Sequence, residues 1–240
     1  PVFVLVALWS KEAAISLGAY LLAYELFIAS GPWSRRLLVL APFILVVVIW
    51  RACWQYLGYG VAEMSFYVDP LAQPAQFVLA LIQRAPLLLL GQWAFPPPEV
   101  TMVVGTTIEV GLWVAAILFG AVLVRLFLPL LRQDRLARFW ATGMAISLLP
   151  ACTTLPSHRM LMFVGFGAMP LMAMYLVFIW HNTNIIAGSW QRKVYSAFGY
   201  LLIILHLIVA PLLLSFCVAS PAGPHWFLSR IMLTRSFDTT

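Results

Sequence analysis

Charge is scarce in this sequence of 240 residues: Asp, Glu, Lys and Arg together make up 9%, whereas hydrophobic residues make up 63%. An average soluble domain has roughly a quarter of its residues charged. So little charge excludes an ordinary soluble domain. Because backbone polar groups must be satisfied inside a bilayer, the expected fold is an all-α polytopic membrane protein.

Cysteine is also scarce, and the basic residues form no patch. Cys53, Cys152 and Cys217 lie in or beside apolar runs without CxxC spacing, which excludes a disulfide framework and a zinc site. The formal net charge is +6, but the basic residues are scattered between apolar runs and are not interleaved with aromatic residues. This pattern speaks against a nucleic-acid partner.

Long apolar runs predict about six transmembrane helices, because about 20 apolar residues cross the hydrocarbon core of a bilayer. Residues 1–9 would end an earlier helix, since the chain begins with Pro1 and not with an initiator Met or a signal peptide. We therefore expect part of a longer protein, with a transmembrane domain over 1–219 and a non-cytoplasmic tail over 220–240. The expected spans are 13–29, 37–57, 105–131, 139–156, 160–180 and 195–219.

The segment 76–96 is apolar enough to cross but carries Arg84 at its middle. If 76–96 lies in the interface or re-enters it, the connections 30–36, 132–138 and 181–194 share one side. That side then has a single acid, Asp134, against seven basic residues: Arg35, Arg36, Arg132, Arg135, Arg138, Arg192 and Lys193. The positive-inside rule makes this side cytoplasmic. The expected location is a bacterial inner membrane, with residues 58–104 as a non-cytoplasmic cap that contains 76–96.

Two short segments resemble motifs of one enzyme family. Residues 8–14, Leu-Trp-Ser-Lys-Glu-Ala-Ala, and 21–25, Leu-Leu-Ala-Tyr-Glu, are similar to an L-S-K-E-x-A … L-L-x-Y-D/E pattern. Residues 157–167, Ser-His-Arg-Met-Leu-Met-Phe-Val-Gly-Phe-Gly, are similar to A-E-R-Y-L-Y-L-P-S-I-G. Both patterns occur in the tetratricopeptide-repeat-bearing O-mannosyltransferases and their bacterial relatives, members of the GT-C glycosyltransferase superfamily. The chain would be the later membrane half of such an enzyme.

The resemblance implies roles for individual residues. It places Lys11 and Glu12 in a pocket and makes Arg159 a ligand of the donor phosphate. His158 stands where the family usually has an acid, and Met162 where it usually has an aromatic residue. The acidic residue that these enzymes carry in their first outer loop would precede Pro1. The sequence therefore offers a cationic clamp without the acidic base.

Each of these residues also has a simpler interpretation. The guanidinium of Arg159 suits phosphate oxygens, but an arginine at a helix end also anchors in lipid headgroups. Lys11 and Glu12 form either a point charge with its orienting acid or a closed ion pair. His158 is an acid, a base, a substrate-binding donor to phosphate or a simple turn residue. Arg84 would line an acceptor path, and His206 inside its span is more often hydrogen-bonded to a neighbour than a metal ligand.

Two functions remain open at this point. The first is part of an integral-membrane glycosyltransferase that uses a polyprenyl-phosphate-linked sugar at the outer leaflet. The second is a non-catalytic helical subunit of a larger membrane complex. The expected partners are membrane lipids, the lipid-linked sugar donor and other membrane subunits. The sequence names no cofactor.

Overall fold

The computed structural model describes residues 1–58, 67–181 and 189–219, and within them every regular element is a helix. The tail over 220–240 and residues 59–66 of the expected cap lie outside the described residues. The α-helices are α1 (Val2–Ser10), α2 (Leu17–Phe27), α3 (Trp33–Tyr56), α4 (Pro74–Trp93), α5 (Thr106–Gln133), α6 (Arg135–Ala151), α7 (Met162–His181), α8 (Ser189–Ile203) and α9 (Ala210–Ala219). Short 3-10 turns are η1 (Glu12–Ser16), η2 (Pro98–Met102) and η3 (His158–Leu161), and Ile204–Val209 is a π-helical segment, η4.

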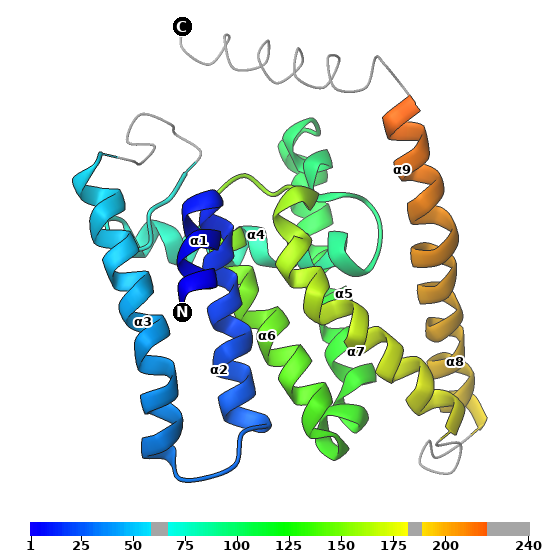
Figure 1. The fold of residues 1–240 in the computed structure, drawn as a ribbon. Coiled ribbons are helices and arrows are strands. Elements are labelled where there is room, and N and C mark those ends of the chain that lie inside the picture. The colour runs from blue at the N-terminus through cyan, green and yellow to red at the C-terminus, as the bar shows by residue number, and fades with distance from the viewer. Residues whose placement is uncertain (59–66, 182–188, 220–240) are drawn as a thin grey trace, which may run out of the picture.

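Most helices run up and down between two ends of a bundle (Figure 1). At one end lie the turn between α1 and α2, residues 67–73, residues 94–105 and the connection 152–161; we call this the cap end. At the other end lie the connections from α2 to α3 and from α5 to α6, together with the start of α8; we call this the arginine end. Two of the three basic connections and the start of α8, which carries Arg192 and Lys193, therefore lie at one end as expected; residues 182–188 of the third connection lie outside the described residues.

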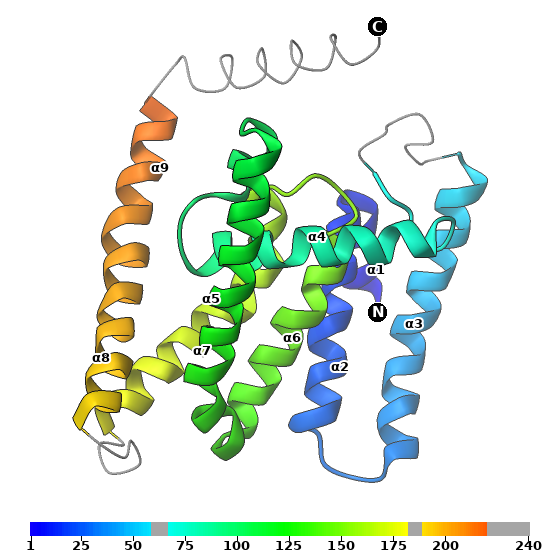
Figure 2. The same cartoon turned by 180° about the vertical axis from the view of Figure 1, so that it is seen from behind.

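Helix α4 differs from its neighbours because it lies across the bundle, crosswise to α5 and α6 (Figure 2). By length and composition alone it belongs to the helices that could cross a membrane. Its crosswise direction agrees with the interfacial position expected for 76–96, and placing it in the interface remains a prediction. Both ends of α4 connect to segments at the cap end, so α3 and α5 traverse the bundle in opposite directions.

Five helices in the described part of the chain are long and apolar enough to cross a membrane, the architecture of a multi-pass integral membrane protein. They are Trp33–Tyr56, Pro74–Trp93, Thr106–Gln133, His158–His181 and Trp190–Ser215. Four of them match expected spans, but the expected spans 13–29 and 139–156 are not among the five.

Both missing spans are shorter as helices than the apolar runs suggested. The run 13–29 begins as a 3-10 turn, so α2 has only 11 residues, about 16 Å at the α-helical rise. Helix α6 has 17 residues and ends at Ala151, before the Thr-Thr-Leu-Pro stretch. The expectation of about six full spans is corrected accordingly, because hydropathy does not show where an α-helix begins or ends.

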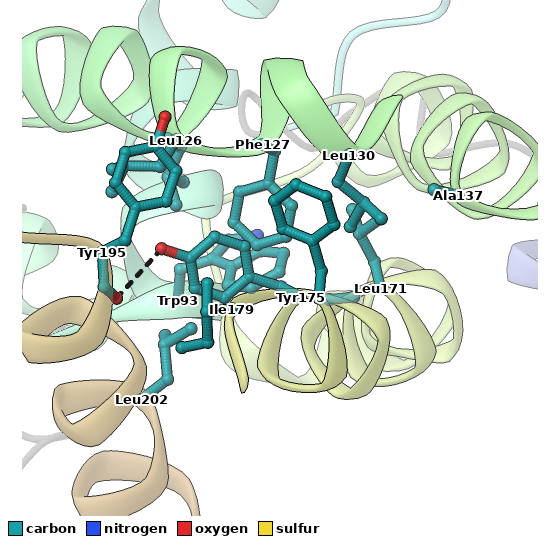
Figure 3. Packing of buried hydrophobic residues seen from close by; sticks show 13 residues of the cluster. Trp93, Leu126, Phe127, Leu130, Ala137, Leu171, Tyr175, Ile179, Tyr195 and Leu202 are labelled. Atoms are coloured by element: carbon teal, nitrogen blue, oxygen red, sulfur yellow. Dashed lines mark hydrogen bonds between the residues drawn. The ribbon is translucent and has the colours of Figure 1, made fainter. Parts of the chain in front are cut away.

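An aromatic core joins α4, α5, α7 and α8 (Figure 3). Tyr175 is fully buried and stacks on Phe127 with ring centroids 4.6 Å apart. Trp93 meets Phe127 edge-on at 5.2 Å. The Tyr175 hydroxyl donates a hydrogen bond of 3.2 Å to the backbone oxygen of Tyr195, which satisfies a polar group that would otherwise be costly to bury. This core fixes the C-terminal end of α4, at Trp93, against the bundle.

A second packing unit holds α2 against α6 and α7. The ring of Tyr20 lies over Gly143 of α6, and its hydroxyl donates to the backbone oxygen of Phe163. Phe166 meets the Tyr20 ring edge-on at 5.3 Å. Gly143 and Gly167 leave the space that Tyr20 fills, because a Cβ at either position would collide with atoms of the Tyr20 side chain.

His206 links the last helix to α4. Its Nδ1 lies 3.0 Å from the backbone oxygen of Leu202, and its Nε2 lies 3.3 Å from the backbone oxygen of Gln92. His206 sits in the π-helical segment, where one extra residue per turn redirects the side chains. The interpretation of His206 as a residue hydrogen-bonded to neighbours is confirmed.

The orientation in a bilayer is testable by thiol labelling. Single cysteines at the exposed residues Ser34, Gln133 and Ala72, in a background without the native cysteines, report on the two ends. We expect a membrane-impermeant maleimide to label Ala72→Cys in intact cells, and Ser34→Cys and Gln133→Cys only after permeabilisation, because the basic connections favour the cytoplasm. Labelling of Ser34→Cys and Gln133→Cys from opposite sides would show that α4 crosses the membrane.

Candidate functional site at the cap end

The connection 152–161, which carries the second motif, is held by backbone and side-chain donors from distant parts of the chain. Nη1 of Arg84 donates to the backbone oxygens of Cys152 and Thr154, each at 2.9 Å. The backbone N–H of Val68 donates to the backbone oxygen of Thr153 at 2.8 Å. Three consecutive carbonyls are thereby satisfied, so the connection has a defined shape where it leaves α6.

Glu99 of η2 holds the next part of the same connection. Its Oε1 accepts hydrogen bonds from the Ser157 hydroxyl at 2.9 Å and from the backbone N–H of His158 at 2.6 Å. The same oxygen also contacts Nδ1 of His158. Its Oε2 is buried and has no hydrogen-bond partner among the described residues. Ser157 in turn accepts from the backbone N–H of Arg159 at 3.3 Å and so caps η3.

The first motif forms a sharp turn at the same end. Helix α1 ends at Ser10, and the extended backbone of Lys11 (φ −157°, ψ 123°) redirects the chain into η1. The turn is tied by the backbone bonds from Lys11 to Ala7, at 2.8 Å, and from Ala14 to Lys11, at 3.0 Å. Lys11 and Glu12 are exposed at the tip of this turn.

Residues 67–73 bring further charges to the cap end. Asp69 forms an ion pair with Arg51 at the end of α3 and accepts the backbone N–H of Leu71 at 2.9 Å. The guanidinium of Arg51 also lies 4.6 Å from the ring centre of Trp54. Burial raises the pKa of Tyr67, and the negative charges of Glu12 and Asp69 raise it further. Glu12 and Asp69 are therefore both electrostatic neighbours of the Tyr67 hydroxyl.

The Arg51–Asp69 pair should make stability depend on pH in the acid range. Partial burial would raise the pKa of Asp69, but hydrogen bonds from Leu71 and Arg51, and the charge of Arg51, outweigh it and lower the pKa. A lowered folded-state pKa gives stability that is present above the unfolded value, about 3.9, and is lost as the pH falls through the folded value. We expect Asp69→Asn to melt lower than the wild type at pH 7.

The difference in melting temperature between the wild type and Asp69→Asn should shrink as the pH falls below about 4, where the native carboxylate of Asp69 takes up a proton. Thermal melts in detergent at pH 7 and pH 3 measure it. The amide oxygen introduced by this substitution can still accept the Leu71 N–H, so the change isolates the charge. A difference that stays constant over this range would contradict the role of the ion pair.

Four of the five residues expected at a site lie at the cap end and are exposed: Lys11, Glu12, His158 and Arg159. Among the described residues, the side chains of Lys11, Glu12 and Arg159 have no hydrogen-bond or ion-pair partner, so Glu12 does not close onto either cation. Arg84 is half-buried and its Nη1 is committed to the connection 152–161. A shared cavity for Lys11 and Arg159 remains a prediction.

A cavity of about 320 Å³ lies elsewhere, between α5 and α7 at the arginine end, and is lined by Leu130, Asp134, Ala173, Met174, Val177 and Phe178. Its lining is mostly apolar, and its one charged residue, Asp134, already accepts the backbone N–H of Leu136 at 2.7 Å as the cap of α6. It includes none of the residues expected at a site. Within the described ranges, no group of three His, Cys, Asp or Glu residues is placed to hold a metal ion.

Sequence reasoning did not assign a site role to Glu99. Its partners lie 58 and 59 residues further along the chain, so no local pattern connects them. The available signal was its rarity: Glu99 is one of only eight acids and follows directly on Pro96-Pro97-Pro98. An acid after a rigid turn in so apolar a chain indicates a specific partner.

Comparisons with protein-family models, with curated proteins and with solved structures give no match. The arrangement itself therefore has to carry the functional argument. It places two exposed cations and a carboxylate-held imidazole on connections at one end of a helical membrane bundle. Such a set can bind an anionic group and exchange a proton beside it.

Proposed function

We propose that this chain is part of an integral-membrane glycosyltransferase of the GT-C type, in a bacterial inner membrane, that uses a polyprenyl-phosphate-linked sugar at the outer leaflet. The observation that carries the proposal is the location of the two motif segments at the cap end, with Lys11 and Arg159 exposed and without acidic partners in the described part of the chain. The opposite end has the basic residues expected of a cytoplasmic face. A donor phosphate would thus meet its cations on the side opposite to the cytoplasm.

The chemistry of the two cations suits a phosphate leaving group. Transfer breaks the bond between the anomeric carbon and a phosphate oxygen, and negative charge grows on that oxygen as the bond lengthens. The planar guanidinium of Arg159 offers two parallel N–H donors to phosphate oxygens, and the ammonium of Lys11 adds a point charge. Donors that are held in place before the reaction stabilise such charge better than mobile solvent does.

A photo-crosslinking experiment tests the proposal. The full-length protein is reconstituted in liposomes with a polyprenyl phosphate that bears a benzophenone. We expect crosslinks to peptides from the cap end, including residues 157–161, and competition by excess polyprenyl phosphate but not by the uncharged polyprenol. Equal competition by the polyprenol would show that the phosphate is not recognised, and the proposed function would then be wrong.

A second candidate, a non-catalytic subunit of a larger membrane complex, is favoured by one feature. Only 6% of the residues in the apolar stretch of α3 are buried within the chain, although this stretch is long enough to span a membrane. Large side chains such as Leu38, 76% exposed, leave this helix with little contact to its own bundle. Partner helices would cover such a surface as well as lipid does. Crosslinking of the probe along α3 alone, without the cap end, would favour this candidate.

A further inference from the structure

Glu99 and His158 form a carboxylate–imidazole pair that the sequence does not reveal. The side chain of Glu99 is 17% exposed, whereas the side chain of His158 is 70% exposed. Oε1 of Glu99 holds both the Nδ1 and the backbone N–H of His158, so the residue is fixed at two points. The imidazole therefore projects from the cap end with its Nδ1 edge held and its Nε2 edge without a hydrogen-bond partner among the described residues.

This arrangement determines what the imidazole can do. When Nδ1 carries the proton and donates it to a carboxylate, Nε2 of the neutral ring keeps its lone pair and can accept a proton. A carboxylate in this position orients the ring and stabilises the cation that forms when Nε2 is protonated. The pair thus has the two parts of a general base: an accessible acceptor and a group that holds it in the productive tautomer.

Among the residues that the structure describes, other charges near His158 do not compete for this role. The elements packed against η3 are α4, α6 and α7. Helix α4 contributes Arg84, which is directed at the carbonyls of Cys152 and Thr154. Residues 139–157 and 160–180 contain no Asp, Glu, Lys or Arg, so α6 and α7 bring no charge from their cap ends. On its own connection, the neighbour of His158 is Arg159.

We propose that His158 is the general base for the acceptor hydroxyl and that Glu99 is its positioning residue. This proposal rests on the proposed function. As the hydroxyl oxygen forms its bond to the anomeric carbon, the bond from that carbon to the phosphate oxygen breaks, and its electron pair leaves with the phosphate beside Arg159. The hydroxyl proton moves to Nε2 of His158 and is later released to water. The neighbouring residues 158 and 159 thus serve the acceptor and the leaving group respectively.

The test measures turnover and chemical rescue in the full-length protein in proteoliposomes. The donors are polyprenyl-phosphate mannose, glucose and galactose, with a serine- and threonine-rich peptide as hydroxyl acceptor, and the readout is release of polyprenyl phosphate. We expect His158→Gly to lower kcat by about 10²- to 10⁴-fold, the usual contribution of a general base. Imidazole added to the buffer should restore part of this loss, because it can occupy the vacated space.

Glu99 is tested by variants that separate positioning from folding. Glu99→Gln should lower kcat with little change in KM, since the substrate does not touch it, and Glu99→Asp should restore part of the activity. Glu109→Gln, at an exposed glutamate in the first turn of α5, is the matched control and should behave like the wild type. The imidazole control is His181→Gly at the arginine end, which should neither lose activity nor respond to imidazole.

The outcomes separate the two proposals. If His158→Gly keeps the wild-type kcat, the general base is overturned and the proposed function still stands. A loss in His158→Gly that imidazole does not restore, while the variant melts like the wild type, assigns His158 a role other than accepting the proton and so also overturns the base. Absence of turnover with every donor and of crosslinking by the polyprenyl phosphate probe overturns the proposed function, and this inference with it.

Discussion

Replacing Gly167 by alanine is expected to loosen the packing of α2 against α6 and α7. A Cβ at this position would lie 2.7 Å from the Tyr20 hydroxyl and 2.8 Å from the backbone oxygen of Trp140. The backbone oxygen cannot rotate away, so either the helices separate or Tyr20 leaves its place. Overpacking of this kind costs about 1–3 kcal/mol, which exceeds the gain of about 1 kcal/mol in helix propensity from glycine to alanine.

The expected loss is measurable as a lower melting temperature in detergent, by roughly 2–4 °C per kcal/mol for a chain of this size. Gly111→Ala is the matched control, because Gly111 is also helical and a Cβ there meets nothing within 4 Å. It should melt at or slightly above the wild-type temperature. If both variants melt alike, Tyr20 does not fill a fixed space between α6 and α7, and the arrangement of α2 would need revision.

Arg159→Ala is expected to weaken binding of polyprenyl phosphate by at least tenfold. A hydrogen bond to a charged group contributes about 1.5–3 kcal/mol, and about 1.4 kcal/mol corresponds to a factor of ten in the dissociation constant. Arg159→Lys should recover only part of the loss, because an ammonium cannot make two parallel bonds to one phosphate. Competition against the benzophenone probe gives the dissociation constants.

Arg35→Ala provides the matched control for Arg159. Both arginines are exposed at helix ends, but Arg35 belongs to the arginine end. Its removal should leave probe binding unchanged when the probe reaches only the outer leaflet. If Arg159→Ala binds the probe as well as the wild type does, Arg159 does not contact the phosphate. The simpler interpretation of Arg159 as an anchor in the lipid headgroups would then be correct. Full activity of Arg159→Lys would argue that charge alone, and not the planar fork, is used.

Local sequence patterns determined much of the helical layout. The expected spans 37–57, 105–131 and 160–180 correspond closely to α3, α5 and α7. Each of these runs is predominantly apolar, with its few charged residues near its ends, and is bounded by polar or turn-forming residues, so its length is visible in the sequence. The separation of basic connections from Lys11 and Arg159 also follows from counting spans, because each crossing moves the chain to the other side.

Helix boundaries near the motifs depended on backbone geometry. The largely apolar run after Glu12 reaches Ile28 with Glu25 as its one charged residue, yet η1 occupies its first turn and leaves α2 short. The packing of Tyr20 between Gly143 and Gly167 accompanies this short helix, and those glycines are more than a hundred residues away from it in the chain. Hydropathy averages over such details because it treats every helical residue alike.

By itself, the sequence determined that this is a helical membrane chain with basic connections gathered at one end, because composition and hydropathy act through solvent and need no tertiary contact. Tertiary structure alone decided the crosswise course of α4, the commitment of Arg84 to the connection 152–161, and the pairing of Glu99 with His158. These depend on side chains 58 to 70 residues away from their partners. Their hydrogen bonds form only after folding brings the cap end together, so no local pattern encodes them.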